Sequence, residues 1–233
     1  MNAPRLSAVL WDMDGTLVDT EPYWMAAETP LIESFGGTWS HEQALSLVGL
    51  GLEDSARILQ GTGVRMSVDD IIAHLTDEVM RQLAVTGVPF RPGARELLAS
   101  LRAAGVKTAL VTMSMRRMAT AVVDLIDFDA FDVIIAGDDA VRPKPFPDPY
   151  LQACEALGVT PDEAVAIEDS PNGLRSAVAS GAAVIGVPLM VSLAGAGAHT
   201  VWPSLDGRTV DHVVEFHSRH RTAGRGAAEE VAR

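Results

Sequence analysis

Short apolar runs and longer amphipathic segments alternate along most of the chain. The short runs have the length of buried strands, and a polar residue, Gly or Pro follows each of them. The longer segments repeat apolar residues at helical spacing and end at glycines or capping residues. Strands that alternate with helices of this length indicate a doubly wound parallel sheet. The predicted strands are residues 8–11, 108–111, 133–136, 164–167 and 183–187, with 199–202 as a candidate edge strand.

One long section, residues 19–88, interrupts this alternation because it is helical throughout. Helices are predicted for residues 21–35, 40–48 and 53–60, and a fourth begins at the Ser67 cap and stops before Gly87. Since this section directly follows the first strand, we expect a cap over the carboxyl end of the sheet. The predicted fold class is α/β, with a Rossmann-like doubly wound parallel core and an inserted all-helical cap domain.

The pattern also predicts domain boundaries. The core would comprise residues 1–18 and 89–217, and the cap residues 19–88, with hinges at the two crossings. The tail, residues 218–233, is rich in Ala, Gly, Arg and Glu and is expected to be disordered. Core helices are predicted for residues 92–105, 116–126, 147–157, 171–180 and 209–216.

The charge balance restricts the partners of the protein. Its 233 residues include 31 acidic and 18 basic side chains, for a formal net charge of -13. Nucleic acids and anionic membrane surfaces bind basic faces, so neither is expected as a partner. The single cysteine, Cys154, follows an apolar helical pattern, which favours the core over a nucleophilic role. Residues 1–7 lack signal-peptide features, and no apolar run reaches the roughly 18 residues of a membrane span. We expect a cytoplasmic monomer.

Two acidic residues, one position apart, end the first strand. Asp12 and Asp14 would point to the same side if the strand continued through them, and Gly15 lets the chain turn afterwards. Open α/β sheets bind ligands at the carboxyl ends of their strands. Paired carboxylates there suit metal binding, nucleophilic attack or proton transfer. Taken alone, however, the pair is also typical of a polar turn.

Later strand ends carry groups that complement these two acids. Thr112 ends the second core strand, and Glu168 and Asp169 end the fourth, where they could complete an oxygen-ligand metal site. Helix capping is the alternative role for each of them. Lys144, one of only two lysines, stands in the proline-rich loop of residues 142–147. A lysine held there could neutralise a phosphate or keep a carboxylate ionised.

The order of these groups resembles the haloacid dehalogenase superfamily, in particular its branch of phosphatases and β-phosphoglucomutases with a helical cap. The resemblance covers nearly the whole chain up to Val187. It rests on Asp-Met-Asp-Gly-Thr-Leu at residues 12–17, Thr-Met-Ser at 112–114, Lys-Pro-Phe-Pro-Asp-Pro-Tyr at 144–150 and Ile-Glu-Asp-Ser-Pro-Asn-Gly at 167–173. The family often has Asn where this chain has Met113, so that position would act through its backbone N–H.

The resemblance implies a role for each matching residue. Asp12 would be the nucleophile that attacks phosphorus to give an aspartyl-phosphate. Asp14 would protonate the leaving oxygen and then activate water. Thr112, Met113 and Lys144 would bind the phosphoryl group, so the partner would be a small phosphorylated metabolite.

The same resemblance implies Mg²⁺ as the cofactor. Its ligands would be Asp12, the main-chain carbonyl of Asp14 and Asp169, with Glu168 as a ligand or a neighbour of the ligands. Elementary electrostatics agrees, because an anionic carboxylate approaches an anionic phosphate only when a dication and a lysine offset their charge.

Cap residues favour a phosphatase over a mutase. Residues 49–55 resemble the loop of β-phosphoglucomutases that places an arginine on a second phosphate, but the aligned residue here is Leu52. Arg57 could substitute, although a solvent-facing charge is its alternative role. We therefore predict Mg²⁺-dependent hydrolysis of a small phosphomonoester of the sugar phosphate or phosphoglycolate type. The alternatives are a β-phosphoglucomutase-like mutase and a catalytically idle module that binds a phosphometabolite or another protein.

Residues near the entrance of the cap are the candidates for substrate contacts. We predict such contacts for Glu21, Gly49, Leu52 and Arg116, with Arg117 as the alternative to Arg116. Trp24 either contacts the substrate or belongs to the core of the cap, and its helical spacing fits both roles.

Overall fold

A six-stranded parallel sheet forms the centre of the computed structural model, which describes residues 6–231, with the backbone alone for residues 222–231. The strands lie in the order β3-β2-β1-β4-β5-β6. Because the order reverses at β1, the carboxyl end of β1 is the point where such sheets bind ligands. The strands are β1 (Ala8–Trp11), β2 (Lys107–Val111), β3 (Val133–Ile135), β4 (Ala164–Glu168), β5 (Ala183–Gly186) and β6 (Thr200–Val201).

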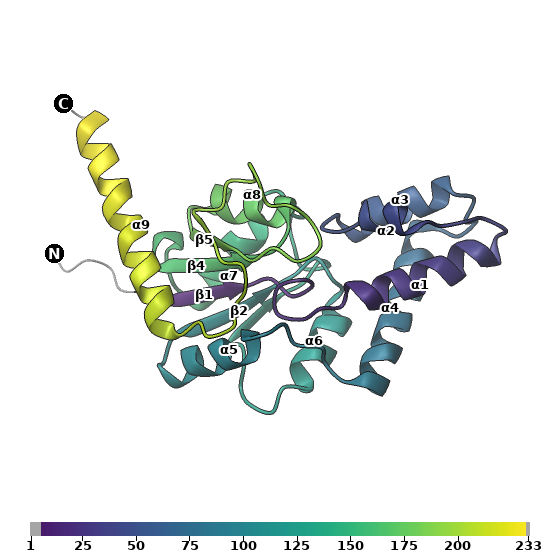
Figure 1. Ribbon diagram of the computed structural model, residues 1–233, viewed down its shortest axis with the longest axis horizontal. Helices are drawn as coiled ribbons and strands as arrows, with labels where there is room; N and C mark the ends of the chain where they lie inside the picture. Colours follow the sequence, from purple (N-terminus) through teal and green to yellow (C-terminus); the bar gives the residue numbers. More distant parts are fainter. Residues whose placement is uncertain (1–5, 232–233) are drawn as a thin grey trace.

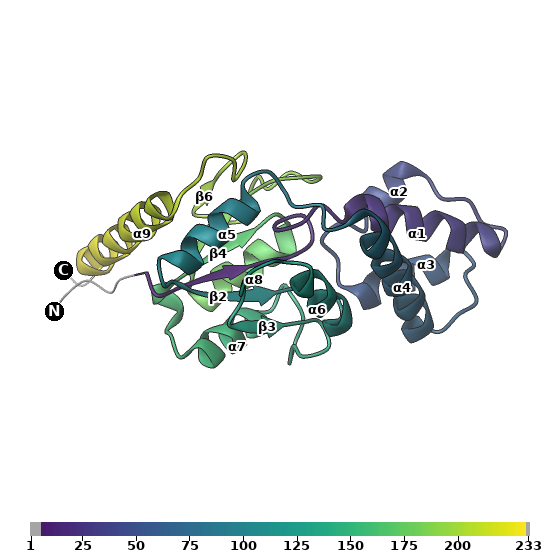
Figure 2. The same ribbon diagram turned by 90° about the horizontal axis from the view of Figure 1, so that it is seen from below.

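Helices cover both faces of this sheet (Figures 1 and 2). Alternate residues of β1 enter two separate cores. Val9 and Trp11 pack towards α5 (Ala94–Ala103) and α6 (Arg116–Asp124), whereas Ala8 and Leu10 pack towards α7 (Asp148–Leu157) and α8 (Pro171–Ser180). The predicted α/β doubly wound fold class is therefore confirmed. The core helices are α5 (Ala94–Ala103), α6 (Arg116–Asp124), α7 (Asp148–Leu157), α8 (Pro171–Ser180) and α9 (Val210–Val231), with a 3₁₀ turn η1 (Pro161–Glu163).

The helical section between β1 and β2 forms a cap beyond the carboxyl ends of the strands (Figure 1). Ser40 and Ser67 begin two of its helices, since each hydroxyl accepts a hydrogen bond from a backbone N–H three residues later. Apolar residues at helical spacing on the longest cap helix, such as Ile71, Leu75 and Val79, are buried. The cap helices are α1 (Glu21–Ser34), α2 (His41–Leu45), α3 (Leu52–Gly61) and α4 (Val68–Thr86).

The two crossings between core and cap lie side by side. The Asp19 N–H donates to the Pro89 carbonyl at 2.8 Å, and the Arg91 N–H donates to the Leu17 carbonyl at 3.0 Å. The crossings therefore form a short antiparallel pair next to the end of β1. Movement of the cap about this pair stays a prediction.

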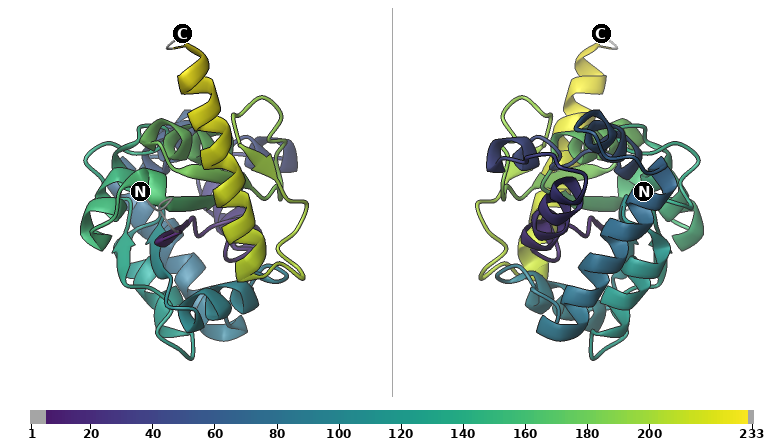
Figure 3. Two further views of the ribbon diagram at one scale, coloured as in Figure 1. Left: turned by 90° about the vertical axis from the view of Figure 1, so that its left-hand side faces the viewer. Right: turned by 90° about the vertical axis from the view of Figure 1, so that its right-hand side faces the viewer.

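The C-terminal helix is longer than the sequence pattern predicts. It was expected at residues 209–216, with a disordered tail at 218–233, but α9 continues to Val231 and projects from the core (Figure 3). The structure is helical over residues 218–231, where the sequence pattern suggested disorder, and the Ala, Arg and Glu residues of this segment are also strong helix formers. Residues 232 and 233 lie outside the described part. Neither α9 nor any other helix among residues 6–231 is long and apolar enough to cross a membrane.

Candidate active site

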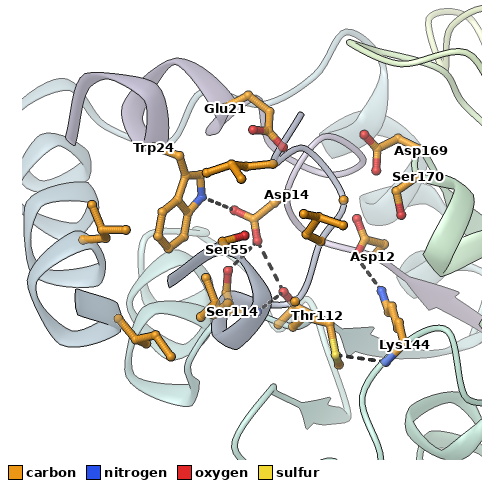
Figure 4. A pocket seen from close by; sticks show the side chains of 18 of the residues that line it. Asp12, Asp14, Glu21, Trp24, Ser55, Thr112, Ser114, Lys144, Asp169 and Ser170 are labelled. Carbon is orange, nitrogen blue, oxygen red and sulfur yellow. Dashed lines mark hydrogen bonds and ion pairs between the residues drawn. The ribbon is translucent and has the colours of Figure 1, made fainter. Parts of the chain in front are cut away.

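A buried lysine joins two acids at the carboxyl edge of the sheet. The Lys144 ammonium donates to Asp12 Oδ1 at 2.7 Å, to Glu168 Oε1 at 2.6 Å and to the Val111 carbonyl at 2.9 Å. Burial by itself would lower the pKa of Lys144, but attraction to the two carboxylates outweighs burial and raises that pKa. Lys144 is therefore a permanent cation at the end of β1 (Figure 4).

The second carboxylate oxygen of Asp12 is buried and has no hydrogen-bond partner among the described residues. Burial, followed by repulsion from Glu168, raises the pKa of Asp12 to about 7, although Lys144 acts in the opposite direction. A buried carboxylate oxygen without a partner is unfavourable unless a cation or a ligand meets it. Since Asp12 lines a pocket between core and cap, a cation or a ligand in that pocket could meet this oxygen.

Three buried carboxylates could hold a metal ion. Asp12, Glu168 and Asp169 each offer an oxygen, and these atoms lie within 4.8 Å of one another. Burial first, and then the charges of Asp12 and Glu168, raise the pKa of Asp169 well above its usual range. Glu168 already accepts hydrogen bonds from Lys144, from the Tyr150 hydroxyl at 2.8 Å and from the Asp169 N–H at 3.1 Å. Hard oxygen donors and excess negative charge fit a divalent cation such as Mg²⁺.

Two glycines leave room for these carboxylates. A Cβ atom on Gly15 would lie 2.0 Å from Asp169 Oδ2, and one on Gly173 would lie 1.8 Å from Glu168 Oε1. Gly15 also has a φ of +80°, a conformation that favours glycine. Both glycines belong to the segments on which the family resemblance rests. The structure shows why glycine is needed at these positions, since a side chain there would collide with a carboxylate of the site.

A buried arginine that the sequence analysis did not identify supports the loop after β1. Arg91 Nη1 donates to the carbonyls of Gly15 at 2.5 Å and Val187 at 2.8 Å, and Nη2 donates to the Pro188 carbonyl at 3.1 Å. These bonds connect the loop that carries Asp14 to the end of β5. The only signal in the sequence for this role of Arg91 was its position at the second crossing between cap and core. That position does not reveal to which carbonyls the side chain would donate.

Four donors surround the carboxylate of Asp14. Trp24 Nε1 donates to Oδ1 at 3.2 Å, and the Thr20 hydroxyl donates to the same oxygen. On the other side, the hydroxyls of Ser114 and Thr112 donate to Oδ2 at 2.6 and 3.3 Å. Asp14 is thus held between the start of the cap and the loop after β2 (Figure 4). Trp24 both packs in the cap and contacts the site, so the two alternatives considered for it coexist.

The pocket brings most of the predicted site residues together. Asp12, Asp14, Thr112, Met113, Lys144 and Asp169 line it from the core, and Glu21, Gly49 and Leu52 line it from the cap. The Gly49 carbonyl accepts from the Asn172 amide at 3.0 Å, which attaches the cap loop to the start of α8. The helix after Thr112 begins only at Arg116, so a loop, and not a helix N-terminus, presents Met113 to the pocket.

Arg116 is the predicted site residue that the structure places elsewhere. Its guanidinium donates to Asp139 and, at 2.8 Å, to the Ile134 carbonyl, and it does not line the pocket. An ion pair at the end of β3 therefore replaces the expected substrate contact. The adjacent Arg117 instead contacts the cap, where it donates to Asp77 and to the Ala73 carbonyl.

Comparisons with known proteins agree with this geometry. Residues 9–187 match the family model described as haloacid dehalogenase-like hydrolase. The phosphorylated carbohydrates phosphatase of Thermotoga maritima is 30% identical over 178 residues, which cover 76% of this chain and 82% of the relative. Hexitol phosphatase A of Escherichia coli is 32% identical over 193 residues, with coverage of 78% and 83%.

A solved structure shows the same likeness. The crystal structure of a CbbY mutant from Rhodobacter sphaeroides in complex with xylulose-(1,5)bisphosphate aligns with a TM-score of 0.79 at 29% sequence identity. The alignment covers 88% of this chain and 98% of that one. The arrangement of core and cap is therefore shared along almost the full length of both proteins.

Proposed function

Because the chain is a phosphatase of the haloacid dehalogenase-like hydrolase family, we propose that it hydrolyses a small phosphomonoester with Mg²⁺ through an aspartyl-phosphate on Asp12. The observation that carries the proposal is the environment of Asp12. Lys144 donates to Oδ1 at 2.7 Å, while Oδ2 is buried at the pocket and no described residue donates to it. One oxygen is thus oriented by a cation, and the carboxylate is available for attack.

The proposed reaction has two steps. In the first, an Asp12 carboxylate oxygen forms a bond to phosphorus, the ester P–O bond breaks, and Asp14 gives its proton to the leaving oxygen. In the second, water attacks phosphorus, Asp14 takes a proton from it, and phosphate leaves with the carboxylate of Asp12 restored. Thr112, Met113 and Lys144 bind the phosphoryl oxygens, and Lys144 offsets the negative charge that develops there.

The proposed metal ligands are Asp12, Asp169 and the main-chain carbonyl of Asp14. A bound dication supplies charge neutralisation between the carboxylate and the phosphate. Glu168 acts through Lys144, because its oxygens already accept from Lys144, Tyr150 and the backbone after β4. Glu21 and the loop at Gly49 contact the leaving group from the cap.

The cap favours water over a sugar as the phosphoryl acceptor. A mutase must hold a second phosphate, but Leu52 occupies the loop position where the related mutases place an arginine. Arg57 lies one turn later, and its side chain is 63% exposed and pairs with Glu53 at 3.5 Å. Lys144 is the only cation among the residues that line the described pocket, and the catalytic site already uses it.

The test is phosphate release by the purified protein from p-nitrophenyl phosphate and from sugar monophosphates in the presence of Mg²⁺. We expect Asp12→Asn to lower kcat by at least about a thousandfold, because the nucleophile is lost, and EDTA to stop turnover. Asp124→Asn, which changes an exposed acid at the end of α6, is the matched control and should keep full activity. Conversion of β-glucose 1-phosphate to the 6-phosphate without phosphate release would contradict hydrolysis.

A further inference from the structure

The cap side of the pocket contains a buried carboxyl group that the hydrolysis steps do not use. Glu28 on α1 is 5% exposed and lines the pocket. Its Oε2 accepts from the Trp39 indole N–H at 3.0 Å, and no group in the described part of the chain donates to Oε1. Burial raises the pKa of Glu28 to about 7, although the Trp39 bond lowers it. A group that is unfavourable to bury, with one oxygen available to the pocket, indicates a ligand contact.

Helix α1 places Glu28 in line with the catalytic acids. Glu21, Trp24 and Glu28 stand at positions i, i+3 and i+7, so they share one face of the helix. Trp24 contacts Asp14, and Figure 4 shows the Glu21 carboxylate next to the same site. Glu28 lies about 10 Å further along the helix axis than Glu21. A leaving group of several carbon atoms is needed to extend from the phosphoryl site to Glu28.

The charge of the pocket restricts this leaving group. Glu21 and Glu28 face it from the cap, and among the described lining residues only Lys144, at the phosphoryl end, is cationic. A carboxylate or a second phosphate on the leaving group would therefore find no cationic side chain to pair with at the cap end of the pocket. The other cap residues of the lining are mostly apolar: Ala44, Leu47, Leu50, Leu52, Ile72 and Leu75.

An uncharged polyol fits this lining better than an ammonium group. An ammonium has three N–H donors to satisfy, whereas Glu28 has one oxygen that is not already paired. A hydroxyl needs a single acceptor, and the C–H faces of a polyol can pack on the Trp24 ring and on the apolar wall. A hydroxyl of the polyol would then pair with the Glu28 carboxyl group, and no further charged group would be needed in the pocket.

We propose that Glu28 is a specificity-determining residue that selects an uncharged, polyhydroxylated leaving group, such as that of a hexitol or hexose monophosphate. The proposal rests on the proposed function, since it concerns the leaving group of the same hydrolysis.

The experiment compares kcat/KM for sorbitol 6-phosphate, 2-phosphoglycolate, ethanolamine phosphate and p-nitrophenyl phosphate in four proteins. These are the wild type, Glu28→Ala, Glu28→Gln and the control Glu33→Gln, which changes an exposed acid on the same helix. Thermal unfolding checks that each variant is folded. Glu28→Gln keeps an acceptor for Trp39, so it preserves the packing if Glu28→Ala does not.

We expect the wild type to prefer sorbitol 6-phosphate to 2-phosphoglycolate and ethanolamine phosphate by at least about tenfold. Glu28→Ala should lower the ratio of kcat/KM for sorbitol 6-phosphate to that for p-nitrophenyl phosphate by about tenfold, mainly through KM, and Glu28→Gln should lower it less. Glu33→Gln should leave the ratio unchanged.

Three results would overturn the proposal. A wild-type preference for 2-phosphoglycolate would show that an anionic leaving group is accepted, and a preference for ethanolamine phosphate would assign the pocket to a cation. An equal fall for sorbitol 6-phosphate and p-nitrophenyl phosphate in both Glu28 variants would assign Glu28 a structural role. If the wild type hydrolysed none of the esters, the proposed function itself would fail, which is a different and recognisable outcome.

Discussion

The pKa values of the buried ionisable side chains of this protein depend on what each side chain contacts. Lys144 keeps its charge because two carboxylates surround it, whereas Asp12 and Glu28 are buried with one oxygen each that no described residue satisfies. Cys154 is also buried, and burial raises the pKa of its thiol to about 11. Its side chain therefore belongs to the core, as its helical pattern predicts, and is not a ready nucleophile.

Glu28 makes the stability of the protein depend on pH. Its pKa is about 7 in the folded protein and about 4.5 in an unfolded chain, so the folded state binds the proton more tightly. The stability associated with the protonated group is fully present below about pH 4.5 and is lost as the pH rises through 7. Glu28→Gln should therefore exceed the wild type in free energy of unfolding by roughly 2–3 kcal/mol at pH 8, with little difference near pH 4.5.

Urea unfolding at pH 4.5 and pH 8, without substrate or metal, measures this difference. Glu33→Gln is again the control, since Glu33 is exposed and should show no comparable change with pH. Parallel pH profiles for the wild type and Glu28→Gln would mean that folding does not raise the pKa of Glu28.

Loops at strand ends, and not the strands themselves, carry most of the site. Asp14 and Gly15 follow β1, Thr112 follows β2, and Asp169 follows β4. The buried Arg91 side chain joins the loop after β1 to the segment after β5, because its guanidinium donates to the carbonyls of Gly15, Val187 and Pro188. The parallel sheet brings the strand ends to one edge, and such contacts then fix the loops relative to one another.

Replacement of Arg91 should test this support. Arg91→Met keeps most of the length of the side chain but removes three hydrogen bonds to buried or partly buried carbonyls. We expect a loss of about 3 kcal/mol in the free energy of unfolding, measured by urea denaturation, together with lower kcat. Arg57→Met, at an exposed ion pair, should change the free energy of unfolding by less than about 1 kcal/mol. Equal effects of the two substitutions would refute a supporting role for Arg91.

The cap and the core of the whole molecule meet through a small number of polar contacts. Asn172 donates to the Gly49 carbonyl, Trp24 donates to Asp14, and Arg117 on α6 donates to Asp77 and the Ala73 carbonyl on α4. These contacts hold the cap over the pocket while the two crossings join it to the core (Figure 2). Lids of this kind exclude water from a reacting group when they close, so we predict that these contacts form as the cap closes.

Arg117→Ala should weaken the closed arrangement without disturbing the core. Because an exposed ion pair contributes up to about 1 kcal/mol, we expect KM for a sugar monophosphate to rise about two- to fivefold with a nearly unchanged melting temperature. Arg116→Ala is the neighbouring control, since its partner Asp139 belongs to the core. A double-mutant cycle with Asp77→Ala measures the coupling, and purely additive effects on KM would show that the pair does not hold the cap.

The sequence by itself determined the fold class and the order of the chemical groups. Asp12, Asp14, Thr112, Lys144 and Asp169 could be assigned to one site because the hydrophobic pattern places all but Lys144 at strand ends. Parallel strands of one sheet share a carboxyl edge, so residues that follow them meet there regardless of the details of packing.

Only the tertiary structure decided which long side chains reach that edge. Trp24 and Glu28 line the pocket and Arg91 supports the loop after β1, whereas Arg116 pairs with Asp139 outside the pocket. The side chain of a helical or loop residue can contact either of two neighbouring groups, and the packing of the cap on the core determines which of them it contacts. That packing depends on contacts between segments far apart in the chain, which local hydrophobic spacing does not encode.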